Sequence, residues 1–397
     1  MLFYKTSTEK LKYNLMSFIL TWSGLVILMS MFVTIPLTLI FVHELHISET
    51  SATWIGSIYS LCFATGCLIY GPLSDKYGRK IFLVIGIITL TIGTFITGFI
   101  QQFEIVLIMR AIQGFAAAAF APLSLVYVSE VFPFEKRLSV TGYISSGFLM
   151  AAVVAQVFGI TVNSLYNWQA IFLFLGIIYF ITALLVIFYL PNDRVADTEK
   201  SLLNRYIQMK YLFKNSKLCI SFFIMFTLYF TLMGMYTLLG RYLQSEFNFT
   251  EENILFVRAL GIFSMLACVF AGKAGNHFGV LRLLQLALIL AGVSLFLMGF
   301  SKIPTLIILF SLLFVAGIAG VVPLNISLVV KNSGAVRGSA VLFNAFSLFL
   351  GASVGPLVAS HLIQKGIIDL AFIVFSVVLF IGLILSVFLR EGTFNDI

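Results

Sequence analysis

Twelve long apolar stretches follow one another along this chain of 397 residues, each near 20 residues in length. A stretch of that length, wound as a helix, spans the hydrocarbon core of a bilayer, which is about 30 Å thick. The approximate limits are 14–41, 52–70, 81–100, 105–130, 139–162, 168–190, 218–241, 254–271, 282–300, 304–329, 337–361 and 367–389. The sequence therefore predicts an all-α membrane protein with twelve transmembrane helices.

The composition excludes an ordinary water-soluble fold. Sixty per cent of the residues are hydrophobic and 10% are charged, whereas a soluble domain carries about 25% charged residues. The 42 phenylalanines suit helices that face lipid. A chain with so little polar surface cannot cover a globule in water, so we expect the lipid bilayer to be its solvent.

The 24 lysines and arginines are distributed unevenly over the loops between these stretches. If the N-terminus is cytoplasmic, nineteen of the 24 lie on the cytoplasmic side, as the positive-inside rule requires. Both termini are therefore expected in the cytoplasm, in a multi-pass protein of the cell membrane. The formal net charge of +8 then reflects topology, and no nucleic-acid partner is expected.

The longest polar stretch, residues 191–217, divides the apolar stretches into six plus six. It carries six cations and three acids, together with apolar residues that would let it lie on the anionic inner leaflet. The predicted organisation is an N-terminal six-helix bundle over residues 1–190, a cytoplasmic linker over 191–217, and a C-terminal six-helix bundle over 218–397.

The two halves resemble copies of each other. Adding 201 to the position of Gly78 gives Gly279, and adding it to Pro122 gives Pro323. Parallel repeats of six spans, with the substrate site between them, are a common transporter architecture. We therefore expect the two bundles to be related by pseudo-symmetry.

A hydrophilic decapeptide, Gly71–Lys80, separates the second and third stretches and reads Gly-Pro-Leu-Ser-Asp-Lys-Tyr-Gly-Arg-Lys. Gly71 and Gly78 permit close helix approach or a positive φ in a tight turn. Asp75 can pair with Arg79 or accept hydrogen bonds from a helix N-terminus, where the dipole favours an anion. The cations could instead serve only to fix the topology, but topology requires neither the aspartate nor the glycines.

These residues give the chain a resemblance to the major facilitator superfamily over essentially its whole length. The decapeptide matches the family signature G-x-L-x-D-x-x-G-R-K at every fixed position, and residues 110–114 match the motif R-x-x-Q-G. With Trp54 and Tyr59, these motifs are most similar to the twelve-span drug and metabolite efflux branch. The chain departs from that branch in its fifth stretch, which lacks the proline and final glycines of the antiporter motif.

The resemblance implies alternating access, with two six-helix bundles rocking about a central cavity. It also implies a charge relay that clamps the outward-facing state, formed by Asp75, Arg79 and an acid of the fourth stretch, here Glu130. The expected function is secondary active transport of a small organic solute, as proton-coupled efflux of a drug or metabolite. Uptake, facilitated diffusion and a non-transporting membrane sensor of the same fold are the alternatives.

Arg110 is the only formal charge away from the ends of the predicted spans. A central arginine costs about 2.5–3.5 kcal/mol on insertion scales, so its presence calls for a role. Gln113 lies on the same helix face, and we expect the pair in the cavity, where it could bind an anionic or zwitterionic substrate group or an exchangeable water. The alternative is a structural arginine bonded to carbonyls or to Gln113.

Gln156, Asn325 and Asn344 supply uncharged polar groups on spans that are also expected at the cavity. None of the sixteen acids falls at mid-membrane, where a proton antiporter normally keeps a carboxylate, so protons are expected from the resemblance alone. The four cysteines show no metal or redox spacing, and no side-chain cluster indicates an enzyme. We expect no cofactor and no metal, and a monomer that binds a small-molecule substrate.

Overall fold

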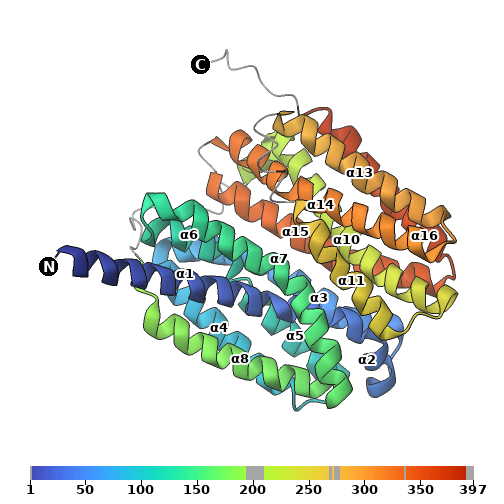
Figure 1. The fold of residues 1–397 in the computed structure, drawn as a ribbon, viewed down its shortest axis with the longest axis horizontal. Coiled ribbons are helices and arrows are strands. Elements are labelled where there is room, and N and C mark those ends of the chain that lie inside the picture. The colour runs from blue at the N-terminus through green and yellow to red at the C-terminus, as the bar shows by residue number, and fades with distance from the viewer. Residues whose placement is uncertain (1, 194–209, 268–270, 272–277, 335–336, 390–397) are drawn as a thin grey trace. The chain divides into compact units, whose positions relative to one another are not determined.

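The structure, a computed structural model, describes residues 2–193, 210–267, 271, 278–334 and 337–389 (Figure 1). Within these residues every regular element is helical, and eleven helical segments are long and apolar enough to cross a membrane. The span expected over 254–271 is represented by α11 (Glu251–Met265), and residues 268–270 lie outside the described part. The chain is thus an all-helical, multi-pass membrane protein, and the count of twelve spans stays a prediction.

The chain divides into two compact units, Met1–Arg205 and Tyr206–Ile397. The elements of the first unit are α1 (Leu2–Phe32), η1 (Ile35–Leu37), α2 (Thr38–Leu45), α3 (Glu49–Tyr77), α4 (Arg79–Thr97), α5 (Phe103–Ala117), α6 (Ala121–Val131), α7 (Phe134–Leu165) and α8 (Trp168–Tyr189). Those of the second unit are η2 (Tyr211–Lys214), α10 (Ser216–Phe247), α11, α13 (Val280–Phe300), α14 (Pro304–Asn332), α15 (Arg337–Gln364) and α16 (Ile368–Ser386). Most of the linker expected over 191–217 lies outside the described residues.

Helix pairing follows the same order in both units. In the first unit α1 packs along α7, α3 along α5, and α4 along α8 (Figure 1). In the second unit α10 packs along α15, α11 along α14, and α13 along α16. Each helix of the first set corresponds in chain order to a helix of the second, as an internal repeat requires.

Gly78 and Gly279, which are 201 residues apart, have similar backbone conformations. Gly78 precedes α4 with φ 96° and ψ 150°, and Gly279 precedes α13 with φ 88° and ψ 130°. This conformation is accessible almost only to glycine. In both places, therefore, a glycine in the same backbone conformation directly precedes a long helix.

Two spans of the first unit are interrupted where proline prevents a continuous helix. The first is divided into α1, η1 and α2 around Pro36, and the fourth is divided into α5 and α6 just before Pro122. Proline lacks the N–H of the helical ladder and its ring clashes with the preceding turn. In the second unit Pro323, the counterpart of Pro122, lies inside the uninterrupted helix α14.

Glycines let the helix pair α1–α7 and its counterpart α10–α15 approach to backbone contact. A Cβ atom at Gly147 on α7 would lie 2.7 Å from the carbonyl oxygen of Thr21, and one at Gly351 on α15 would lie 2.2 Å from that of Phe226. Side chains cannot be accommodated at such distances. Gly147 and Gly351 thus serve helix packing, each within its own unit.

Candidate functional site

The decapeptide folds as the end of α3, a single-residue turn, and the start of α4. Gly78 ends α3 by donating its N–H to the carbonyl oxygen of Ser74 at 2.9 Å, and it is also the residue that precedes the first turn of α4. Arg79 consequently occupies the first position of α4. This places a cation at a helix N-terminus, which the helix dipole disfavours.

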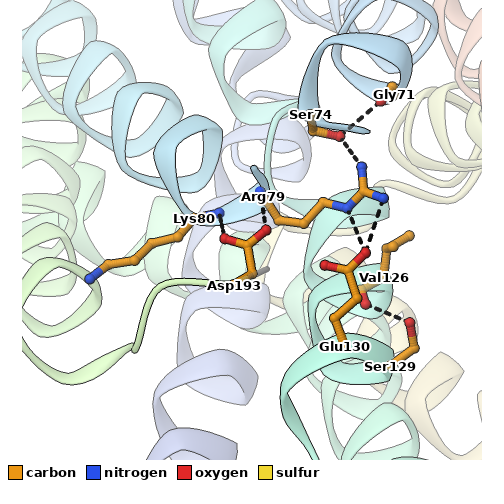
Figure 2. A network of polar contacts seen from close by, with 8 residues as sticks. All are labelled: Gly71, Ser74, Arg79, Lys80, Val126, Ser129, Glu130 and Asp193. Carbon is orange, nitrogen blue, oxygen red and sulfur yellow. Dashed lines mark hydrogen bonds and ion pairs between the residues drawn. The ribbon is translucent and has the colours of Figure 1, made fainter. Parts of the chain in front are cut away.

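The guanidinium of Arg79 is held by an ion pair with Glu130 on α6. Its Nε and Nη2 atoms donate to Oε1 of Glu130 at 3.3 and 3.1 Å, and its Nη1 donates to Oγ of Ser74 at 2.6 Å (Figure 2). Ser74 in turn donates to the carbonyl oxygen of Gly71 at 2.9 Å. The side chains of Arg79 and Glu130 keep 9% and 28% of their exposure, so the pair is partly withdrawn from solvent. Charge-assisted hydrogen bonds such as these are strongest away from solvent.

Asp193, in the segment that follows α8, contacts the same turn from the other side. Its carboxylate accepts hydrogen bonds from the backbone N–H of Arg79 and, at 3.0 Å, from that of Lys80 (Figure 2). Asp75 was the residue expected to make such a helix-terminus contact, and its side chain lies outside the described residues. Sequence reasoning missed Asp193, because an acid 114 residues from Arg79 carries no local signal of capping another helix.

Two further hydrogen bonds bind the end of α8 and the segment after it to α4 and α6. Lys80 donates its Nζ to the carbonyl oxygen of Ile187, in the last turn of α8, at 3.1 Å. Tyr127 on α6 donates its hydroxyl to the carbonyl oxygen of Pro191 at 2.7 Å. The turn between α3 and α4, the end of α6 and the chain after α8 therefore form one polar network.

Arg110 on α5 is fully buried, and it forms a second polar centre within the first unit. Its Nε donates to the carbonyl oxygen of Ile55 at 3.2 Å, and its Nη2 donates to that of Ser30 at 2.7 Å. Its Nη1 donates to Oγ of Ser30 at 2.9 Å and to Oε1 of Gln113 at 2.8 Å. The guanidinium carbon lies 4.3 Å from the ring centroid of Tyr59, a cation–π distance.

The position of Ser30 explains how a buried arginine can lack a carboxylate partner. Ser30 lies in the last turn of α1, where carbonyl groups have no intrahelical partners and the dipole favours a cation. Gln113 extends the network by donating to Gly93 and Thr97 on α4 at 3.0 and 2.7 Å. These contacts join α1, α3, α4 and α5, and they favour the structural alternative for Arg110 over a substrate-facing guanidinium.

The remaining polar candidates fall into two separate groups. Gln156 on α7 is buried and donates to the carbonyl oxygen of Ala152 at 2.7 Å. In the second unit, Asn325 on α14 donates to the carbonyl oxygen of Ser221 at 3.0 Å and to Oδ1 of Asn344 on α15 at 3.2 Å. The structure thus brings Asn325 and Asn344 together, as it does Arg110 and Gln113.

An ion pair of different character lies in the second unit. Lys302, in the loop between α13 and α14, donates to Oδ2 of Asp369 at the start of α16 at 2.5 Å. Both side chains are largely exposed, and the hydrogen bond to Asp369 raises the pKa of Lys302 above its ordinary value. Among the described residues no group of three or more His, Cys, Asp or Glu side chains is placed to hold a metal ion.

Comparison with known proteins identifies the family of this chain. The family model of the Major Facilitator Superfamily matches residues 20–335 and 259–395. The chain therefore belongs to the Major Facilitator Superfamily, whose members are membrane transporters.

Several curated relatives match along most of the chain. The multi-drug resistance efflux pump PmrA of Streptococcus pneumoniae is 27% identical over 346 residues, which cover 83% of this chain and 85% of that protein. The uncharacterized MFS-type transporter YceJ of Bacillus subtilis is 24% identical over 341 residues, which cover 84% of this chain and 85% of that protein. The multidrug resistance protein MdtG of Salmonella paratyphi B is 24% identical over 352 residues, which cover 86% of this chain and 87% of that protein.

A solved structure supports the fold. The crystal structure of the human organic anion transporter MFSD10 (TETRAN) matches 94% of this chain and 99% of that chain, with a TM-score of 0.75 and 17% sequence identity. At that identity the likeness shows the fold alone.

Proposed function

We propose that this protein exports a small organic solute, a drug or metabolite, by alternating access coupled to protons. The efflux assignment is supported by the relatives PmrA and MdtG, whose names describe multidrug efflux or resistance and which match most of the chain. The coupling to protons is part of the proposal, and it is based on the resemblance of the signature motifs to the efflux branch.

The observation that carries the proposal is the ion pair between Arg79 and Glu130. It joins the first turn of α4 to the last turn of α6, and Asp193 holds the same turn of α4. In the proposed mechanism this network is a latch at one end of the first unit. It is closed in one state of the transport cycle and opens when the helix ends separate.

The orientation of the protein in the membrane is inferred from the distribution of its lysines and arginines. Because nineteen of the 24 lysines and arginines fall on one side of the predicted topology, we place the turn between α3 and α4, together with both termini, in the cytoplasm. The latch would then act at the cytoplasmic end of the transport path. Within the described residues the buried charged side chains are Arg79, Arg110 and Arg258. None of these is an acid that could balance a cationic solute, so we propose that an anionic or zwitterionic solute is exported more readily than a cation.

The test is flux through the purified protein in liposomes. Anionic, zwitterionic and cationic compounds would be loaded in parallel, with a pH gradient of either sign or none, and empty liposomes as control. The proposal predicts transport that reverses or stops when the gradient is reversed or dissipated by a protonophore. Flux that is independent of the gradient would indicate facilitated diffusion, and no flux of any compound would favour a non-transporting role.

A further inference from the structure

The first turn of α4 receives its helix cap from a distant part of the chain. The first N–H groups of a helix have no intrahelical partners, and Gly78, which precedes α4, has no side chain to accept them. The carboxylate of Asp193 accepts from two of these groups, those of Arg79 and Lys80. An anion at this position also complements the positive end of the helix dipole.

Gly78 supplies the backbone conformation of this turn, because its φ of 96° is one that other residues rarely adopt. A Cβ atom at Gly78 would lie 3.5 Å from Oδ1 of Asp193, in ordinary van der Waals contact. The turn therefore presents its backbone directly to the carboxylate. At Gly279, the counterpart in the second unit, nothing lies within 4 Å of such an atom, so the cap by a distant acid is a feature of the first copy among the described residues.

We propose that Asp193 is a positioning residue of the latch, which fixes the first turn of α4 so that Arg79 reaches Glu130. Asp193 binds the backbone N–H of Arg79, whereas Glu130 and Ser74 bind its guanidinium. The two acids thus hold the same residue at two points (Figure 2). Asp193 acts through the backbone, and the ion pair acts through the side chain.

The same contact connects the latch to the chain that leads towards the second unit. Asp193 follows α8 by four residues, and this short segment is also bound to α6 through Tyr127 and Pro191. Lys80, next to Arg79, binds the last turn of α8 through Ile187. A displacement of the segment after α8 is therefore transmitted to the first turn of α4 and, through Arg79, to Glu130.

The first test is transport by Asp193→Asn, which keeps the shape of the side chain and removes its charge and one acceptor. This inference rests on the proposed transport function, so Vmax and KM are measured for the solute that the wild type exports. We expect Vmax to fall about fivefold, the factor that loss of one hydrogen bond corresponds to, with KM unchanged. Wild-type Vmax in a folded Asp193→Asn protein would overturn the proposal.

The second test needs no substrate. Melting temperatures are compared for the wild type, Asp193→Asn, Glu130→Gln and the double variant in the same detergent. If both acids act on Arg79, the melting temperature of the double variant falls by clearly less than the sum of the decreases in the two single variants. The reason is that the effects of residues that share a partner are not additive. Additive losses would overturn the positioning role, whatever the outcome of the transport assays.

Asp369→Asn is the matched control. Asp369 also lies in the first turn of a helix and accepts a hydrogen bond from a lysine, but it belongs to the second unit. The decrease in melting temperature caused by Asp369→Asn should therefore add to the decrease caused by Glu130→Gln. If Asp193→Asn does not yield folded protein, Asp193→Glu replaces it in both tests, with the same expected coupling to Glu130→Gln and the same contradicting result.

Discussion

Arg79 and Glu130 form an ion pair across 3.1 Å, although each lies at the end of its own helix that disfavours its charge (Figure 2). Arg79 is the first residue of α4, at the positive end of the dipole, and Glu130 is the last but one of α6, at the negative end. Each charge is therefore stabilised by its partner against its own helix. Separating the two helix ends would leave both charges unfavourably placed, as the proposed latch requires.

Glu130→Gln should weaken the closed latch and slow transport. We expect the free energy of unfolding to fall by about 1–2 kcal/mol, less than for a fully buried charged hydrogen bond, because the Glu130 side chain keeps 28% of its exposure. Transport should fall at least about tenfold, a factor that corresponds to about 1.4 kcal/mol. Thermal unfolding and liposome flux measure the two effects.

The control for this variant is Glu135→Gln, which removes an exposed acid in the first turn of α7. It should leave both the melting temperature and the flux close to the wild-type values. Equal losses in the two variants would show that the effect of Glu130→Gln is one of general surface charge.

Gly78→Ala should strain the turn between α3 and α4. A residue with a Cβ atom in this backbone conformation costs about 1–3 kcal/mol, and the new methyl group would also lie against the carboxylate of Asp193. Gly279→Ala carries the same strain, and no atom of the described residues lies within 4 Å of its new methyl group. We expect both variants to melt at lower temperature and only Gly78→Ala to slow transport, and similar flux in the two would contradict a special role of the first turn.

Arg110→Ala should destabilise the first unit. It leaves the buried oxygens of Ser30, Ile55 and Gln113 without their donor, at about 1–3 kcal/mol for each group that stays unsatisfied, so we expect a total of about 3 kcal/mol or more. Arg110→Lys keeps the charge but lacks the planar fork of the guanidinium, so its free energy of unfolding should lie between those of the wild type and Arg110→Ala. A fully stable Arg110→Ala protein with a raised KM for anions would instead support substrate binding by Arg110.

The fold class could be predicted from the sequence because bilayer thickness fixes the length of a spanning helix. The correspondence of Gly78 with Gly279 was also readable, since the backbone conformation that the two share demands glycine at both positions. The interruption of spans near Pro36 and Pro122 was not predicted, although the prolines are visible, because Pro323 shows that a proline can also lie within an uninterrupted helix.

The candidate site was only partly accessible to sequence reasoning. The contact between Arg79 and Glu130 was anticipated, and the structure contains it. The cap by Asp193 was missed because its partners are backbone groups, which leave no residue pattern. Arg110 was recognised from the sequence as a buried charge, but its partners were not. They depend on the last turn of α1, where the carbonyl oxygen of Ser30 lies 2.7 Å from Nη2 of the guanidinium.

The central claim is that the contact between residues 79 and 130 controls transport. Its most direct test is the charge exchange Arg79→Glu with Glu130→Arg, compared with both single variants in liposome flux under a pH gradient. Each single variant places like charges together and should transport below about one tenth of the wild-type rate, whereas the exchanged pair restores the attraction and should recover several-fold over either single variant. An exchanged protein that is folded but no faster than the single variants, or single variants that transport at the wild-type rate, would contradict the account.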